Sequence, residues 1–516
     1  MFSRKRLLAI PLLLSAFAYN TATAQDETDA LRYSATSVNS TARSIGLGGA
    51  VGALGGDFST LSVNPAGIGV YRRSELTFTP SVKVNGSSSA YNGTTTADNT
   101  SRFNINNLGV VFTSSAEGKR YERSKWKSVS FGIGFNRIAD FNRNYTYGGY
   151  QATPQGPNDT NPNHSSGAEV FSIDANKYKN DVYNASSTLA FLGYQSFLLD
   201  TFQGSYFPVT FYTTGVNQQR IVNQRGGMND VAISLGGNYD EKLMLGASIG
   251  IPSIRFRREI TYTEKDATNN PYNYFDNFSY HETLFTHGSG MNLKLGFIYK
   301  PVEAFRFGVS VHTPTYFSLK DEQDRDLTTN TENFKDSLGY VNANPVTFIK
   351  GDKNLFEYNY ISPWRAVVSA AGFFGKYGFI SADYEYVDYA SAQYSFDASY
   401  SDYQSATNKA IKAAYKGASN LRVGVEGRIE HFSVRLGFNY MGSPYRNTNI
   451  NGQTIGISGG VGFRFENMFF DLGMMHSTVE MPDQPYALNY SIPVNVPTAT
   501  VKHTLNNAAL TFGVKF

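Results

Sequence analysis

Apolar residues alternate with small or polar residues along most of this chain. The clearest segment carries Val129, Phe131, Ile133 and Phe135, with serine or glycine at every intervening position. Successive side chains of a β-strand point to opposite faces, so this pattern predicts a strand with one apolar face and one face of small or polar residues. Segments of this kind recur from Leu76 to the C-terminal Phe516 and predict about 14 strands.

The connections between these segments alternate between short and long. Tyr239-Asp240-Glu241 and Phe465-Glu466-Asn467 are tight turns, whereas 139–228 and 319–357 are long and polar. Short turns at one end and long loops at the other are typical of outer-membrane barrels. In lipid every backbone N–H and C=O must be paired, and a closed barrel achieves this. For residues 74–516 we therefore predict an all-β fold, a transmembrane antiparallel β-barrel of about 14 strands in the outer membrane of a Gram-negative cell.

Composition favours a membrane barrel over a soluble secreted all-β protein, the alternative that alternation alone leaves open. Of the 516 residues, 17% are charged, whereas a soluble protein has roughly 25%. The 38 Phe and 35 Tyr gather near strand ends, where aromatic girdles belong. The chain has no Cys, which excludes a disulfide scaffold and a thiolate metal site. Phe516, with Phe512 and Val514 at period two, resembles the terminal assembly signal of such barrels.

Residues 1–24 match a secretory signal peptide. A cationic start at 4–6 precedes the short apolar stretch 7–18, and Ala22-Thr23-Ala24 is a small-x-small cleavage site. Removing this segment takes three of the 45 Lys and Arg, so that 42 remain against 42 Asp and Glu. A neutral chain lacks the basic footprint of nucleic-acid-binding proteins, and we expect no nucleic-acid partner.

Residues 25–73 have no strand pattern and predict a compact plug. The run 44–56 consists mostly of glycine and small apolar residues, and Asn64-Pro65-Ala66 follows it. Proline disfavours a central strand, while glycine permits unusual backbone angles. A barrel of about 14 strands has a lumen too wide for its own side chains to fill. We therefore expect this N-terminal hatch to lie inside the lumen, with Asn64, Pro65 and Ala66 as the residues that fix its conformation and control gating.

Several of these segments resemble the FadL/TodX family of outer-membrane transporters for long-chain fatty acids and aromatic hydrocarbons. Ala42-Arg43-Ser44-Ile45-Gly46 and Gly48-Gly49-Ala50, followed by Asn64-Pro65-Ala66, resemble the family's hatch. Tyr299-Lys300-Pro301-Val302 and Ile361-Ser362-Pro363-Trp364-Arg365 resemble parts of its barrel. The resemblance implies a 14-stranded barrel with an internal hatch, an external hydrophobic groove and an opening in the wall for lateral escape.

The second half of the loop 139–228 is unusually apolar. Phe191, Tyr194, Leu198 and Phe202 follow helical spacing. They predict a partly helical extracellular cap that binds a hydrophobic small molecule. The same residues would also suit a helix that packs on other loops as a small core, and the two interpretations are compatible.

Other candidate chemistry is sparse. Gly456-Ile457-Ser458-Gly459-Gly460 matches a hydrolase motif but lies in an alternating strand segment, where the required strand–turn–helix is missing. His281 and His287 share a strand parity and leave heme ligation open. The basic cluster at 255–258 could contact lipopolysaccharide or a substrate carboxylate. We therefore expect no catalytic residue, metal or cofactor.

The leading hypothesis is a passive outer-membrane channel for hydrophobic molecules such as long-chain fatty acids or aromatic hydrocarbons. Its expected partners are a hydrophobic ligand and the surrounding lipid and lipopolysaccharide. The principal alternative is a barrel module of a protein secretion system that holds exported cargo at the cell surface. A heme or hemin receptor is a lesser alternative. The sequence carries no signal for an oligomeric state.

Overall fold

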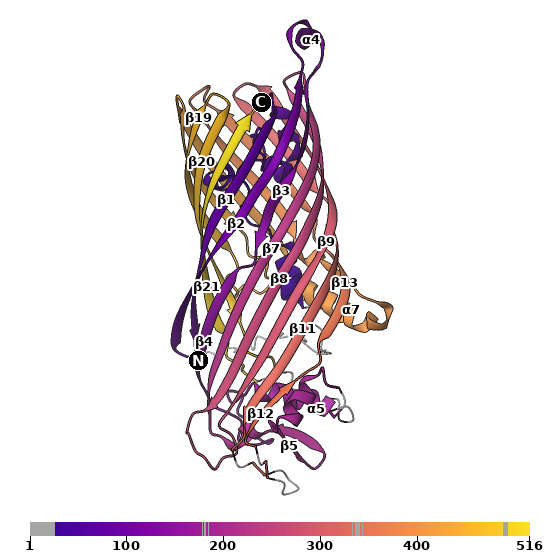
Figure 1. Cartoon of the computed structure of the whole chain (residues 1–516), viewed down its shortest axis with the longest axis vertical. Helices are drawn as coiled ribbons and strands as arrows, with labels where there is room; N and C mark the ends of the chain where they lie inside the picture. The colour runs from indigo at the N-terminus through magenta and orange to yellow at the C-terminus, as the bar shows by residue number, and fades with distance from the viewer. Residues whose placement is uncertain are drawn as a thin grey trace, which may run out of the picture.

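A computed structural model describes residues 26–516 except 178, 180, 181, 184, 333, 336–340, 343 and 489–493. The predicted signal peptide, 1–24, lies outside the described residues. The chain forms a closed antiparallel barrel of 14 strands, as the alternation predicts (Figure 1). Closure is made by antiparallel pairing of the first and last strands, with Leu76 opposite Val514 and Phe78 opposite Phe512. The terminal aromatic segment is therefore part of the wall.

Most barrel strands are continuous and a few are interrupted. The continuous strands are β1 (Glu75–Tyr91), β2 (Thr94–Ser115), β7 (Val216–Tyr239), β8 (Leu243–Asp266), β9 (Asn277–Val302), β17 (Gly417–Ile429), β18 (Phe432–Met441), β19 (Thr454–Phe465), β20 (Met468–Asp483) and β21 (Ala499–Lys515). The interrupted strands are β3 (Trp126–Asp140) with β4 (Arg143–Gln151), β10 (Phe305–His312) with β11 (Tyr316–Asn330), β12 (Val346–Lys350) with β13 (Asn354–Ile361) and β14 (Arg365–Phe373), and β15 (Gly378–Asp388) with β16 (Gln393–Ser395).

An apolar belt covers the outer surface at the end of the barrel that carries the tight turns. On β8 the exposed residues near the turn are Leu245, Ile249 and Ile251, whereas those farther along the same strand are polar or charged and include Arg255 and Arg257. A transmembrane β-strand needs about 10 residues to cross the bilayer, but β8 has 24. The strand therefore continues beyond the lipid. The turn end faces the periplasm and the extended end faces the exterior.

This extracellular extension corrects the bounds of two predicted connections. The connection predicted at 139–228 is shorter, because β4 and residues 216–228 of β7 are strand. The stretch 319–357, predicted as a long connection, is largely strand, because β11 and β12 and the start of β13 lie within it. Beyond the belt the outer face meets water, so apolar residues no longer alternate and the strand pattern is lost from the sequence. The extension is one-sided, because β17, β18 and β19 have only 13, 10 and 12 residues.

The helices lie inside the barrel, on its extracellular loops, or at a turn. The hatch contains α1 (Glu27–Ser34), α2 (Ala42–Gly46), α3 (Thr60–Val63) and the 3-10 helix η1 (Pro65–Val70). The cap, residues 152–215, contains α5 (Ala168–Lys177), α6 (Leu189–Gln195), the hairpin of β5 (Leu199–Phe202) and β6 (Ser205–Pro208), and η2 (Val209–Tyr212). The rest are α4 (Gly118–Arg123) at a periplasmic turn, and η3 (Tyr389–Ser391), η4 (Ala398–Tyr400) and α7 (Ser401–Ala414) between β15 and β17. In the described part of the chain, no helix combines the length and the apolar character needed to cross a membrane.

Candidate functional site

The hatch presses directly against inward-facing glycines of the barrel wall. A Cβ at Gly296 of β9 would overlap Asn64 Oδ1, and a Cβ at Gly246 of β8 would overlap the Pro65 carbonyl. Farther around the barrel, a Cβ at Gly424 of β17 would lie 2.7 Å from the Leu47 carbonyl oxygen. The small residues that alternate with apolar ones in the sequence are therefore the positions that admit the hatch.

The Asn64-Pro65-Ala66 motif joins two hatch segments to the wall. Asn64 Nδ2 donates to the carbonyls of Gly52, at 2.7 Å, and Phe297, at 3.3 Å. Asn64 Oδ1 accepts from the Ala66 backbone N–H at 3.1 Å, which caps η1. Asn64 is 1% exposed, so these bonds are protected from water. The motif thus connects the Gly52 segment and η1 of the hatch to β9 of the wall. Its part in gating stays a prediction.

Buried charges also attach the hatch to the periplasmic half of the barrel. Glu426 of β17 pairs with hatch residue Arg43 at 3.2 Å and with Arg435 of β18 at 2.7 Å. Arg435 reaches Asp471 of β20 at 2.5 Å. Asp383 of β15 accepts hydrogen bonds from two successive backbone N–H groups of the hatch, at residues 51 and 52. The two hatch contacts are made to β15 and β17, which are neighbouring strands of the wall.

A cavity of about 130 Å³ lies between the hatch and the lumen wall. Its apolar lining includes Val38, Val63, Ile138, Met228 and Phe317. Its charged lining consists of Arg137, Lys294, Arg365, Arg422 and Glu385, and the His312 ring adds a polar group.

The charged groups of this lumen cavity are arranged in buried pairs. Lys294 pairs with Asp230, while Glu385 pairs with Arg422 at 3.1 Å and Arg365 at 3.5 Å. The lining thus carries four cations, including Arg137, against the single acidic side chain of Glu385, while Asp230 pairs with Lys294 and Asp140 pairs with Arg137 from behind the lining. An apolar surface beside cationic groups suits an amphipathic ligand with an anionic head.

The wall of the barrel is broken between β3 and β4, at Phe141 and Asn142. Pairing of β2 with β3 ends at Asn107 opposite Asn136, and β4 pairs with β7 but not with β2. Consequently, within the described residues, the backbone of 94–106 in β2 pairs with β1 but with no strand on the side that faces β4. We call this interruption the wall break.

Asp140 organises the backbone at the wall break through several hydrogen bonds. Its carboxylate accepts from the backbone N–H of Asn142 at 3.0 Å and from Lys83 Nζ at 3.2 Å. Arg137 Nη2 donates to Asp140 Oδ2 at 3.1 Å and to the Gly226 carbonyl at 2.6 Å. Beyond the break, β4 makes side-chain contacts with the β1–β2 hairpin, because Ser87 Oγ donates to the Asn144 carbonyl at 2.5 Å. The chain at the wall break is therefore held in place by specific side-chain hydrogen bonds.

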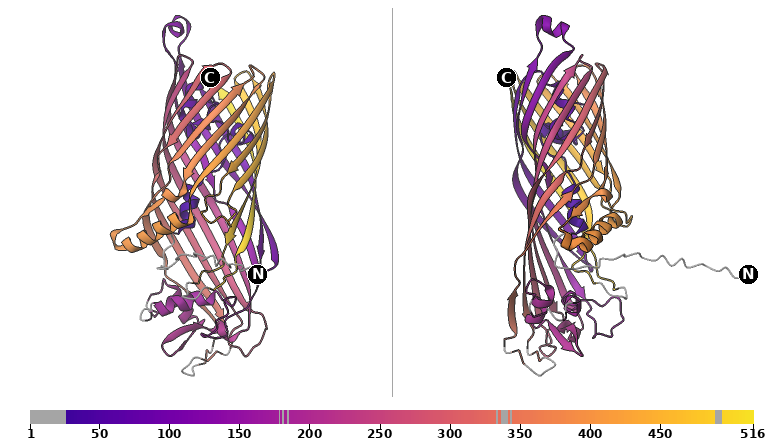
Figure 2. Two further views of the ribbon diagram at one scale, coloured as in Figure 1. Left: turned by 180° about the vertical axis from the view of Figure 1, so that it is seen from behind. Right: turned by 90° about the vertical axis from the view of Figure 1, so that its right-hand side faces the viewer.

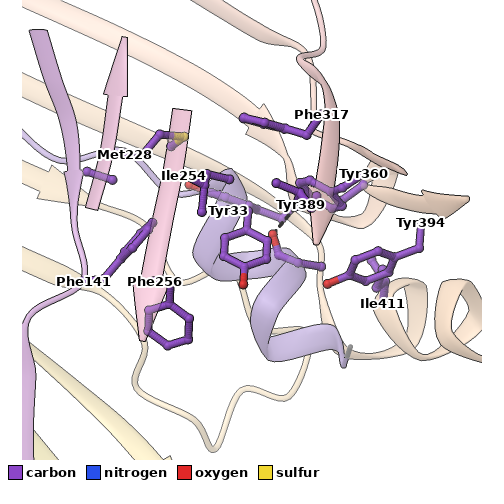
Figure 3. Packing of buried hydrophobic residues seen from close by; sticks show 14 of the residues in the cluster. Tyr33, Phe141, Met228, Ile254, Phe256, Phe317, Tyr360, Tyr389, Tyr394 and Ile411 are labelled. Carbon is purple, nitrogen blue, oxygen red and sulfur yellow. Dashed lines mark hydrogen bonds between the residues drawn. The ribbon is translucent and has the colours of Figure 1, made fainter. Parts of the chain in front are cut away.

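An aromatic cluster packs around α1 and includes Tyr33, Phe141, Phe256, Phe317, Tyr360 and Tyr394 (Figure 3). Tyr33 of α1 packs on Phe141 and Tyr360, with ring centroids 6.3 and 6.0 Å away. The Tyr360 hydroxyl donates to the Ala30 carbonyl at 2.7 Å. The cluster thus brings together the start of the hatch, the wall break and β13. Long-range packing of this kind leaves no signal in the sequence.

Comparison with known proteins decides the fold family. No protein-family model matches this chain, and no curated protein matches it. A Pseudomonas aeruginosa FadL homologue superposes with a TM-score of 0.55 and 12% identity, over 93% of this chain and 98% of that chain. The P. putida toluene transporter TodX superposes with a TM-score of 0.52 and 12% identity, over 93% of this chain and 99% of that chain.

This chain has the FadL/TodX fold. The shared fold confirms the barrel, the internal hatch and the outer-membrane location that the sequence predicts. The break in the wall of this FadL/TodX-type barrel lies at Phe141 and Asn142, a position that the sequence did not reveal.

The cap of this FadL/TodX-type barrel does not place the four predicted ligand residues on one helical face. The predicted helix through Phe202 is wrong, because α6 ends at Gln195 and Phe197 has a left-handed φ of 61°. Leu198 is fully buried in the cap core, Phe191 and Tyr194 are partly buried, and Phe202 is 60% exposed. Leu198 is thus a core residue, while the other three keep some accessible surface.

The cap is attached to the barrel through Glu264 of β8. Glu264 accepts from Ser166 Oγ at 2.6 Å, from the Gly167 backbone N–H at 2.7 Å and from Gln218 Nε2 at 2.8 Å. Gly167 precedes α5, so the carboxylate lies at the positive end of that helix dipole. This contact fixes the cap over the extracellular end of the lumen.

The remaining candidate residues do not form a reactive site. His281 contacts Asp326 at 3.2 Å, and His287 stacks on Phe285. Six residues of one strand separate the two histidines by roughly 20 Å, too far to share one iron. Ser458 lies within β19 and donates to the Gly46 carbonyl of the hatch at 3.3 Å. No cluster of metal-ligating side chains occurs among the described residues.

Proposed function

We propose that this protein is a passive outer-membrane channel for hydrophobic or amphipathic small molecules. The observation that carries the proposal is the wall break beside the lumen cavity and the aromatic cluster. A hydrophobic molecule gains little by crossing a wet pore, but it can leave a lumen sideways into lipid through an unpaired stretch of wall. The hatch supports this route because it fills the periplasmic half of the barrel.

The proposed route has three stages. The ligand first meets the cap, where Phe191, Tyr194 and Phe202 offer apolar surface. It then passes the aromatic cluster into the lumen cavity. It finally leaves between β2 and β4, whose backbones are not paired and which are joined by side-chain contacts.

The ligand class follows from the lining of the cavity. The apolar side suits an alkyl chain or an aromatic ring, and Arg365 and Arg422 suit a carboxylate because guanidinium groups bind carboxylates in fork geometry. The neighbour TodX is described as a toluene transporter. We favour long-chain carboxylates over neutral hydrocarbons for this chain, because the cavity carries a surplus of cations. The proposal assigns no catalytic residue, cofactor or metal.

A reversible cross-link across the wall break tests the route. The chain has no native Cys, so Thr96→Cys combined with Thr146→Cys introduces one disulfide between β2 and β4, where the Thr96 hydroxyl contacts the Thr146 carbonyl. The oxidised protein should lose uptake of a labelled fatty acid in cells, and reduction should restore it.

The matched control is Ser234→Cys with Ser248→Cys. These hydroxyls lie 2.8 Å apart on the adjacent strands β7 and β8, where the wall is continuous. Its disulfide should leave uptake unchanged. Undiminished uptake in the oxidised 96–146 protein would contradict the lateral route. Loss of uptake in both cross-linked proteins would also contradict it.

A further inference from the structure

Helix α7 projects sideways from the barrel wall at the level where the short strands end (Figure 2). It runs from Ser401 to Ala414 and is followed within three residues by β17. Thr407 and Ile411 are its buried residues, and Ile411 joins the aromatic cluster around α1. The opposite face carries exposed Lys409 and Lys412. The helix is therefore attached by one face, and its other face is open.

The C-terminal half of α7 lies in a corner that carries several cations. Lys409, Lys412 and Lys416 have no carboxylate within 4.0 Å in the described part of the chain. Exposed Arg446, from the loop between β18 and β19, donates to the carbonyls of Lys412 and Tyr415 at 3.2 Å. We call these four cations the basic corner.

The two chain segments that supply the basic corner contain no acid near it, and the acids closest to it are Asp402 in the first turn of α7 and Asp26 and Glu27 at the start of α1, near Tyr415. Neither 403–425 nor 431–465 contains any Asp or Glu. The basic cluster on β8 is different, because Arg257 pairs with Glu259 at 2.7 Å and Arg225 reaches the same carboxylate. Lysines near a helix C-terminus also stabilise the helix dipole. Stabilisation of the helix dipole does not require three lysines, and it does not require an arginine from another loop.

The basic corner borders the outer edge of the lipid belt. Tyr384 and Tyr386 of β15 are exposed outward-facing tyrosines of the kind that form aromatic girdles. A Cβ at Gly417, the residue after Lys416, would overlap the Tyr386 hydroxyl. Leu421 of β17, four residues farther along, is exposed and belongs to the apolar belt. The lysines therefore lie at the height of the lipid head groups.

We propose that the basic corner binds the phosphate groups of lipopolysaccharide in the outer leaflet. Lysine ammonium groups act as point charges toward phosphate, and the attraction between such basic groups and an anionic lipid surface adds up residue by residue. Binding there would hold α7, and through Ile411 the aromatic cluster, in a fixed position relative to the membrane. The proposal is independent of the transported ligand.

The test is binding of purified full-length protein to bisphosphorylated lipid A, measured by native mass spectrometry in detergent. The triple variant Lys409→Gln, Lys412→Gln and Lys416→Gln should weaken lipid A binding at least about tenfold, since each charge near an anionic surface contributes comparably. The matched control, Lys119→Gln, Arg120→Gln and Arg123→Gln on exposed α4, removes three cations at the periplasmic end and should bind as the unmodified protein does.

Two further arms identify the ligand group. Dephosphorylated lipid A should bind the unmodified protein as weakly as lipid A binds the triple variant, and inorganic phosphate alone should not compete at millimolar concentration. Heat-modifiable migration verifies that each variant is folded. Wild-type affinity in the folded α7 variant, an equal loss in the α4 control, or strong binding of dephosphorylated lipid A would each overturn the proposal.

Discussion

Tyr33 of the hatch and Phe141 at the wall break pack edge to face, with ring centroids 6.3 Å apart and an interplanar angle of 63°. The two residues are far apart in the sequence, and one belongs to the plug while the other belongs to the wall. Their contact connects the start of the hatch to the proposed exit from the lumen. A ligand that displaced Tyr33 would therefore act on the wall break directly.

Phe141→Ala should loosen α1. Removing a buried Phe costs about 3–5 kcal/mol, and here the lost contacts are those with Tyr33 and Phe256. We expect trypsin added to the protein in detergent to cut faster after Arg32, which is 15% exposed at its side chain. Phe131→Ala, on the lipid-facing side of the same strand, is the control and should leave cleavage after Arg32 unchanged.

Gly296→Ala should displace the hatch. Its new methyl group would overlap Asn64 Oδ1, so the hydrogen bonds that Asn64 makes to the wall and the hatch must shift. Single-channel conductance in planar bilayers should rise toward that of a protein lacking 25–73. Gly427→Ala, where nothing lies within 4 Å of the added Cβ, should conduct like the unmodified protein. Equal conductance of the Gly296 variant would mean that the hatch is not held by this contact.

Glu426→Gln should weaken the attachment of the hatch to the barrel. The buried carboxylate pairs with Arg43, Arg435 and Arg428, and removing one partner of such a network costs about 3–5 kcal/mol. The temperature at which the folded band disappears in a heat-modifiability gel should fall. Glu303→Gln is the control, because that carboxylate is 89% exposed in its pair with Lys300. A similar shift in both variants would contradict a special role for Glu426.

Two substitutions in the cap separate ligand capture from cap folding. Leu198→Asp places a charge in the cap core, so we expect rapid proteolysis of 152–215 in an assembled barrel.

Phe202 lies on the surface of the cap, so Phe202→Asp should leave the cap resistant to protease. If Phe202 contacts the ligand, its loss removes roughly 1.5–3 kcal/mol, which is about tenfold or more in affinity. Uptake of a labelled fatty acid measures this effect, and unchanged uptake in the Phe202 variant would exclude this residue from the capture site.

The sequence by itself determined the barrel. Alternation of Val129, Phe131, Ile133 and Phe135 with small residues specifies a strand between lipid and lumen, because a pleated strand must show one face to each. The same local rule located the hatch, since 25–73 lacks the alternation and contains Asn64-Pro65-Ala66. The inward glycines, such as Gly296, were visible as small residues, although their contact with Asn64 was not.

Only the tertiary structure decided where the wall breaks and what surrounds the lumen. The wall break depends on Asp140 meeting Lys83 and Arg137, and the aromatic cluster depends on Tyr33 meeting Phe141 and Tyr360. The cap likewise buries Leu198 and exposes Phe202, because the chain leaves the helix at Phe197. Strand periodicity reports which side of a sheet a residue faces. It does not report which distant residue lies opposite, and that is decided by the closure of the barrel around its hatch.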